Sequence, residues 1–288
     1  MSNIYNYLNL EALNQVYEAV LSEFQEVYKT MKNNKNILLE KISEILLNYI
    51  VKDDVLKLSE KEKQKILEEL FKLIEESSFK EYKNEKKKME SSFEIATQDT
   101  HDLKYYILTC GSNKKYKKLK KETKQDIINR VIDGKLWSDR LWDNKAEIEL
   151  LLKKDIKNFL DGKISVNKIK KSINDRYSTN ASNTNRLVSN EIARCQCEVN
   201  EQFFKDEEIE EVIYLATLDT RTCKRCQNYD GKIFKLNESR PKLPLHIGCR
   251  CCYIETVPEW TPIHRRDNTI VDSHINFKDY KNWLKEEK

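Results

Sequence analysis

The sequence contains few of the residues that interrupt regular secondary structure. It has 5 glycines and 4 prolines among 288 residues, and every proline lies at or after Pro241. A β-protein needs frequent turns, for which glycine and proline are the usual residues, so this shortage excludes a β-rich fold for most of the chain. Because 35% of the residues are also charged, the composition predicts a mainly α protein with an elongated helical body.

Several functional signals are absent as well. No stretch reaches the roughly 20 apolar residues that span a bilayer, and the N-terminal MSNIYNYLNL lacks the basic region, apolar run and cleavage site of a signal peptide. No glycine-rich phosphate loop, H-E-x-x-H or G-x-S-x-G motif occurs. His101 and His264 have no nucleophile nearby and are interpreted as surface histidines. These absences predict a protein that has no membrane span and is not an enzyme.

Helical patterns fill most of the chain before the first proline. The expected helices cover residues 8–31, 36–51, 59–88, 118–132, 138–160, 166–177 and 183–204. One apolar face of the last helix is formed by Val188, Ile192, Cys195, Val199 and Phe203. Cys195 is therefore expected to be a core thiol. Glu191 and Arg194 stand one turn apart on this helix and are expected to form a surface ion pair.

Cysteine is the most informative residue type that is present. The segment from Leu218 to Glu255 holds the potential metal ligands Cys223, Cys226, His246, Cys249, Cys251 and Cys252. A Cys-x-x-Cys pair, followed at a distance by a second Cys and His cluster, offers a tetrahedral cation two short chelates on separate loops. Zinc is favoured, because calcium and magnesium prefer oxygen ligands. Disulfides are the alternative, but a chain without a secretion signal is expected in a reducing compartment.

Four ligands complete a zinc site, and the sequence leaves one of them open. Cys223 and Cys226 form the first half-site. His246 and Cys249 form a second half-site with the same spacing, and Cys251 is the alternative to His246. Four protein ligands leave no position for water, so the predicted zinc site is structural and not catalytic.

The residues around the ligands predict a small α+β module. Residues 211–220 and 232–234 are expected to be strands, separated by turn residues. So small a unit buries little apolar area, and zinc binding supplies on the order of 10 kcal/mol in such modules. The nearby acids Asp219, Asp230 and Glu255 have no catalytic role in this interpretation.

Interruptions of the helical pattern indicate the organisation of the chain. They occur at residues 110–115 and 205–211, where the regular apolar spacing stops. The expected regions are 1–110 (N-terminal helices), 111–205 (a second helical region), 206–258 (the zinc module) and 259–288 (a C-terminal tail). The tail is polar and charged with interspersed aromatic residues, which is typical of a segment that becomes ordered on a partner.

The motifs around the cysteines resemble those of a known family. D-x-R-T-C-x-x-C, D-G-K-x-F and P-x-x-H-x-x-C-R-C, between Asp219 and Cys251, resemble the C-terminal signature of phage minor head proteins, the Mu F-like or head-morphogenesis family. Upstream, GKLWSDRLWDN and LVSNEIARCQCEVNEQFF are similar to that family's tryptophan-containing helix start and its I-A-R-T-E helix, although Cys195 and Gln196 replace the Thr and Glu. The resemblance covers about residues 134–258.

This resemblance implies a role in head assembly. The expected protein is a minor structural component of a tailed-phage or prophage head, acting in capsid assembly near the portal. Its expected partners are portal, major capsid or scaffold proteins, first in the host cytoplasm and then in the virion head. A toxin is a weaker alternative, because the roughly thirty residues after Pro258 are too few for a further stable domain.

A basic run suggests contact with DNA. The net charge is only +4, but the run KKYKKLKKETK is rich in lysine, and its candidate DNA-contacting residues are Lys114, Lys115, Lys117, Lys118, Lys120 and Lys121. The run is interpreted either as a solvated helix face or as a surface that contacts the phosphates of packaged double-stranded DNA without sequence preference. The second interpretation leaves open an alternative function, a zinc-dependent DNA-binding or DNA-modifying protein.

Overall fold

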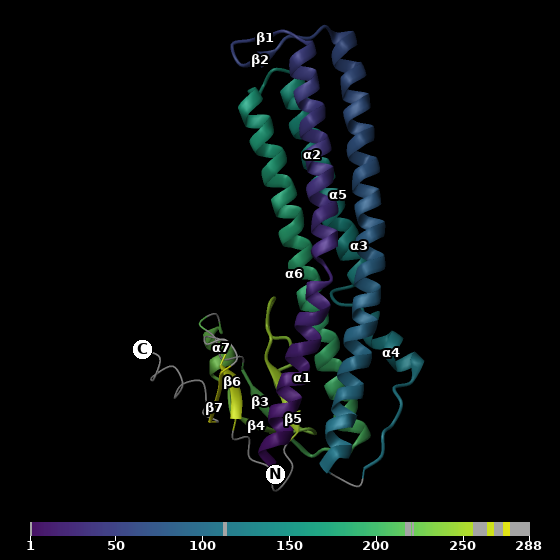
Figure 1. The fold of residues 1–288 in the computed structure, drawn as a ribbon, viewed down its shortest axis with the longest axis vertical. Helices are drawn as coiled ribbons and strands as arrows, with labels where there is room; N and C mark the ends of the chain where they lie inside the picture. Colours follow the sequence, from purple (N-terminus) through teal and green to yellow (C-terminus); the bar gives the residue numbers. More distant parts are fainter. Residues whose placement is uncertain are drawn as a thin grey trace. The chain divides into compact units, whose positions relative to one another are not determined.

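The computed structural model describes residues 2–111, 114–216, 220, 222–255, 264–267 and 273–276, and helices dominate it (Figure 1). The helices are α1 (Ser2–Ser22), α2 (Gln25–Asn48), α3 (Glu60–Gly111), α4 (Lys121–Ile128), α5 (Trp137–Leu160), α6 (Val166–Asp206) and α7 (Lys224–Gln227). The strands are β1 (Val51–Lys52), β2 (Val55–Leu56), β3 (Glu211–Leu215), β4 (Ile233–Lys235), β5 (Cys252–Glu255), β6 (His264–Asp267) and β7 (Ser273–Asn276). The predicted mainly α fold with a small C-terminal α+β module is confirmed.

Helix boundaries differ clearly from the sequence prediction in four places. The first break falls between α1 and α2 and not after Met31; α4 is shorter than the predicted helix 118–132; α3 continues past Lys88 to Gly111; and α6 is continuous through residues 178–182. In the last two cases polar side chains face the interior, such as Thr97 on α3 and Asn180 on α6, which are each at most 2% exposed. Because these buried positions are polar, the apolar periodicity of the helix fades although the helix continues.

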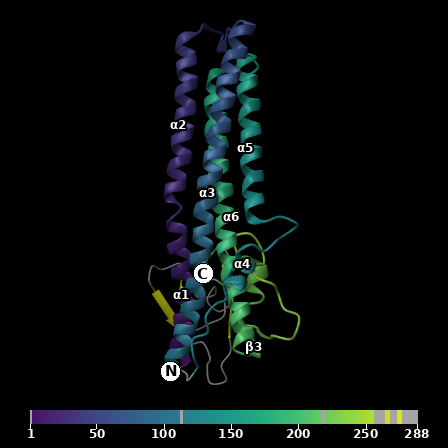
Figure 2. The same cartoon turned by 90° about the vertical axis from the view of Figure 1, so that its right-hand side faces the viewer.

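The chain forms two compact units, and each collects segments that are distant in sequence. Unit 1 comprises Met1–Ser22, Ser91–Arg130 and Val188–Lys288, and unit 2 comprises Glu23–Glu90 and Val131–Leu187. In unit 2, α2, the first part of α3, α5 and the first part of α6 run side by side (Figures 1 and 2). None of the described helices combines the length and apolar character needed to cross a bilayer.

A buried layer of polar side chains crosses unit 2. Lys145 of α5 donates hydrogen bonds to Glu81 (3.1 Å), to Glu85 and to Asn180 (3.0 Å). The two carboxylates on α3 also accept bonds from Asn34 of α2 and from Asn180 and Thr184 of α6. This polar layer (Asn34, Glu81, Glu85, Lys145, Asn180 and Thr184) therefore ties all four helices together.

Unit 1 contains a three-stranded antiparallel sheet in the order β4-β3-β5. β3 pairs with β4 through Val212 and Phe234, and with β5 through Tyr214 and Tyr253. The two predicted strands are present as β3 and β4, whereas β5 was not predicted. One face of the sheet packs on a core formed by Tyr105, Phe203, Phe204, Val212, Tyr214, Ala216, Cys226, Leu243, Cys249, Cys251 and Tyr253. The ends of α3 and α6 thus share a core with the cysteine segment.

Candidate metal centre

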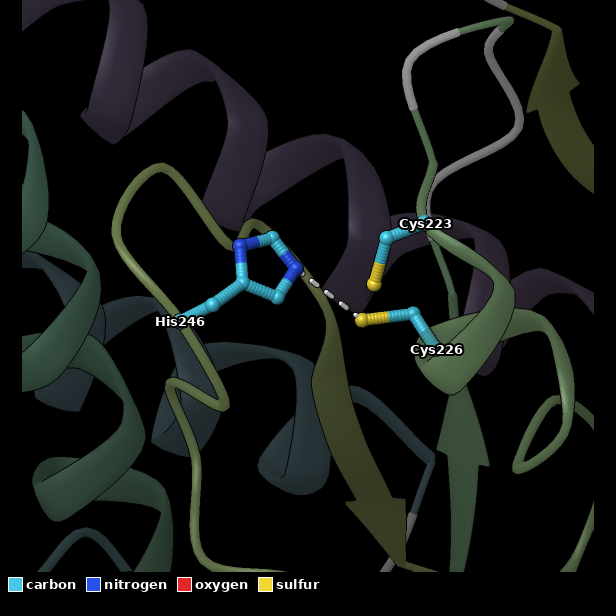
Figure 3. Close-up of side chains that lie close together, drawn as sticks. All are labelled: Cys223, Cys226 and His246. Atoms are coloured by element: carbon cyan, nitrogen blue, oxygen red, sulfur yellow. Dashed lines mark hydrogen bonds between the residues drawn. The ribbon is translucent and has the colours of Figure 1, made fainter.

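The first half-site is built on a single helical turn. Cys223 precedes α7, and its carbonyl accepts a hydrogen bond from the N–H of Gln227 at 3.0 Å. Cys226 lies inside this turn and is 1% exposed. A turn of this kind brings the side chains of residues three apart onto one side, which explains the Cys-x-x-Cys spacing. Figure 3 shows the sulfur atoms of Cys223 and Cys226 facing the imidazole of His246.

The second half-site is a tight loop. The N–H of Cys249 donates to the carbonyl of His246 at 3.0 Å, and Gly248 completes the loop with a φ of +76°, a conformation that favours glycine. The imidazole of His246 is oriented by a 2.9 Å contact between its Nδ1 and the carbonyl of Ile247. Because the carbonyl can only accept, Nδ1 carries a proton, and Nε2 is the nitrogen that faces Cys226.

The donor atoms of the two half-sites converge on Cys226. Cys223, Cys226 and His246 form one group whose ligand atoms lie within 4.8 Å of one another, and Cys226, Cys249 and Cys251 form another. The Sγ atoms of Cys226 and Cys249 are 3.9 Å apart, and the Cys226 Sγ is 3.3 Å from the His246 Nε2. A tetrahedral zinc with bonds of about 2.3 Å to sulfur separates two sulfurs by about 3.8 Å. Each of the two groups therefore has donor atoms that could hold a metal ion, and Cys226 belongs to both.

Three of the thiols interact strongly with one another. Hydrogen bonding from Cys251 lowers the pKa of Cys226, although burial opposes this, and Cys251 likewise lowers the pKa of Cys249. The pKa of Cys251 is raised in return, because its proton is held by Cys226 and Cys249. All three side chains are at most 5% exposed. A buried cluster of thiols that lower the pKa of Cys226 and Cys249 is suited to a cation, since metal ligation requires deprotonated sulfur.

This cluster lies inside a recognisable family region. Residues 152–254 match the family model described as Phage Mu protein F like protein. This part of the chain is Mu F-like. The match includes every cysteine and histidine of the cluster and extends from α5 to β5. It confirms, over this range, the resemblance that the sequence motifs indicate. No curated protein and no solved structure matches the chain.

The remaining cysteines of the Mu F-like region lie outside the cluster. Cys252 packs against Ile213, Leu215 and Ile254 in a separate small core. Cys195 is fully buried, as predicted, and burial raises the pKa of its thiol to about 11. Cys195 also belongs to neither group of convergent ligand atoms. The cysteines whose side chains are described are all free thiols.

The I-A-R segment of the Mu F-like region is a buried anchor. Glu191 and Arg194 form an ion pair of 2.8 Å, but they are 0% and 3% exposed, so the expectation of a surface pair is wrong. Arg194 also donates to the carbonyls of Ile127 and Ile128 at the end of α4. These carbonyls have no partner within their own helix, and a buried guanidinium satisfies both. The amide of Gln196 similarly donates to the carbonyl of Leu13 on α1.

Two further buried groups were missed because their residue types are usually exposed. Lys104 on α3 donates to the Glu255 carboxylate at 2.5 Å, and both side chains are at most 2% exposed. The Lys104 ammonium also lies 4.7 Å from the centre of the Phe203 ring. His101 is 2% exposed and contacts Asp102 and Tyr105, so the prediction of a surface histidine is wrong for it. The side chain of His264 lies outside the described part of the chain.

The basic run is divided between two environments. Lys114 and Lys117 both form ion pairs with Glu207, at 3.1 and 2.8 Å. All six candidate lysines of the run, which the structure describes, are exposed, but only Lys114 and Lys117 pair with this carboxylate. Lys118, Lys120 and Lys121 line one surface pocket together with Lys124. The lysines available to an anionic partner are therefore those around the start of α4.

Proposed function

We propose that this chain is a minor structural protein of a tailed-phage or prophage head that acts in capsid assembly near the portal. The observation that carries the proposal is the Mu F-like match over residues 152–254 together with the thiol and imidazole cluster inside it. A family of phage proteins with this region suggests a head or morphogenesis role. The helical fold with a small sheet suits a structural component.

The cluster is proposed to bind one structural zinc ion. The proposed ligands are Cys223, Cys226, Cys249 and either His246 or Cys251; two groups of convergent ligand atoms that share Cys226 support the proposal. Thiolate and imidazole donors fit zinc, and the sulfur separation of 3.9 Å fits its bond lengths. Bound zinc would cross-link α7 to the loop before β5. Four protein ligands leave no open position, which supports a structural role and not an enzymatic one.

Head assembly defines the proposed partners and location. The partners are portal, major capsid or scaffold proteins, and the protein lies in the host cytoplasm during assembly and in the virion head afterwards. The exposed lysines around the start of α4 are proposed to contact packaged double-stranded DNA through its phosphates. Such contacts are non-specific in sequence and weaken with salt.

Particle assembly in the producing host tests the proposal. The gene is deleted and then complemented with the parent, with Cys226→Ser or with Cys195→Ser, and particles are examined by electron microscopy and mass spectrometry. We expect the chain in purified heads, and DNA-filled heads only with the parent and Cys195→Ser. Normal infectious particles that form without the chain would contradict head assembly and favour the zinc-dependent DNA-binding alternative.

A further inference from the structure

One tyrosine hydroxyl is buried in the metal cluster. Tyr214, in the middle of β3, is 0% exposed and lies in the same core as Cys226, Cys249 and Cys251. Its hydroxyl has no hydrogen-bond partner among the described residues. A buried hydroxyl without a partner is costly, because it has lost its hydrogen bonds to water. Its position therefore calls for an acceptor.

The other tyrosines of this core have such acceptors. The hydroxyl of Tyr253 donates to the carbonyl of Pro241, and that of Tyr105 donates to the Glu207 carboxylate, both at 2.8 Å. The thiols of Cys226, Cys249 and Cys251 are buried in the same core as Tyr214. The hydroxyl of Tyr214 thus shares its surroundings with the thiols of the cluster and, among the described residues, lacks the oxygen acceptor that the other two tyrosines have.

We infer that Tyr214 is a positioning residue of the metal centre, whose hydroxyl donates a hydrogen bond to a ligand thiolate, Cys226 or Cys251, when zinc is bound. A thiol is a weak acceptor, whereas a thiolate carries a negative charge and accepts strongly. Metal binding removes the thiol proton and so creates the acceptor that the hydroxyl lacks. The inference rests on the proposed zinc site and adds a residue that no ligand motif contains.

This hydrogen bond has a functional consequence. It spreads the negative charge of the zinc–thiolate group and holds the sulfur in place. Groups that support metal ligands in this way change metal affinity by about 10- to 100-fold when they are removed. Tyr214 would therefore slow zinc loss and protect the ligand sulfur from electrophiles, because a hydrogen-bonded thiolate is a poorer nucleophile.

The test compares Tyr214→Phe with Tyr253→Phe in the full chain. Both changes remove one hydroxyl from the same core, but the hydroxyl of Tyr253 is bonded to a backbone carbonyl. We expect zinc transfer to a chromophoric chelator to be at least about 10-fold faster in Tyr214→Phe and unchanged in Tyr253→Phe. The cobalt-substituted protein should also show a shifted thiolate-to-metal charge-transfer band only in Tyr214→Phe.

Failure of the inference is distinguishable from failure of the zinc site. A parent protein that binds no zinc contradicts the proposed metal centre itself. A parent that binds zinc, with zinc loss and cobalt spectra unchanged in Tyr214→Phe, overturns the role of Tyr214 alone. If Tyr214→Phe does not fold, the parent protein is used instead, and its infrared tyrosine C–O band is compared with and without zinc. That band must shift on zinc loading, and an unshifted band also overturns the inference.

Discussion

Replacement of Lys145 by methionine should destabilise unit 2 strongly. Lys145 is 2% exposed and places its ammonium between Glu81 and Glu85, which are 3% and 1% exposed. Methionine has a similar length but no charge, so Lys145→Met leaves two carboxylates buried without their cation. Removing one partner of a buried pair costs about 3–5 kcal/mol. We expect a loss of this size in the free energy of unfolding at pH 7.

The loss should diminish as the pH falls. Burial raises the pKa of Glu85 in the folded protein, and Lys145 opposes this shift. A carboxyl group with a raised pKa binds more protons when folded, so its contribution to stability is present below its ordinary pKa of about 4.5 and is lost as the pH rises through the raised value. Without Lys145 the pKa of Glu85 rises further, because the opposing charge is gone. The difference between parent and variant should therefore be smaller at pH 5 than at pH 7.

Urea unfolding followed by circular dichroism measures both effects. Lys154→Met is the matched control, because Lys154 lies on the same helix but is exposed; it should change stability by less than about 0.5 kcal/mol. Adding Glu81→Gln and Glu85→Gln to Lys145→Met should restore part of the loss. A Lys145→Met protein within about 1 kcal/mol of the parent, at both pH values, would refute the buried polar layer.

Three further predictions concern unit 1. Glu255→Gln should lower the stability by about 2 kcal/mol in thermal or urea unfolding, because Lys104 loses its buried carboxylate; an effect no larger than that of the exposed control Glu238→Gln would contradict the pair. Replacing Lys115, Lys118, Lys120 and Lys121 with Gln should flatten the salt dependence of duplex binding by up to about 4 units of slope. The same change at Lys114 and Lys117, which pair with Glu207, should flatten the salt dependence less. Sequence-dependent binding, or a slope unaffected by the four substitutions, would refute the proposed DNA contact of Lys115, Lys118, Lys120 and Lys121.

The cysteine module was predictable because its signal is local. The Cys-x-x-Cys spacing corresponds to one helical turn, and the spacing of His246 and Cys249 corresponds to a tight loop with Gly248. Both half-sites are therefore specified within a few residues. The choice between His246 and Cys251 is not local, because both can approach Cys226 only after the chain folds back.

Features that depend on distant partners were not predictable. β5 has Tyr253, Ile254 and Glu255 buried in succession, so it lacks the alternation of a half-exposed strand. Glu81 and Lys145 are of residue types that are usually exposed, and only the other helices of unit 2 make them interior. His101 and Arg194 are also of residue types that are usually exposed, and contacts within unit 1 make them interior.

Zinc content of the purified protein tests the central claim most directly. Elemental analysis should find about one zinc per chain in the parent and in Cys195→Ser, and none in Cys223→Ser or Cys226→Ser. Comparison of His246→Ala with Cys251→Ser then identifies the fourth ligand, as the variant that loses zinc. The structural zinc site would be contradicted if the parent protein bound no metal and its C-terminal module resisted proteolysis no better than that of the Cys226→Ser variant.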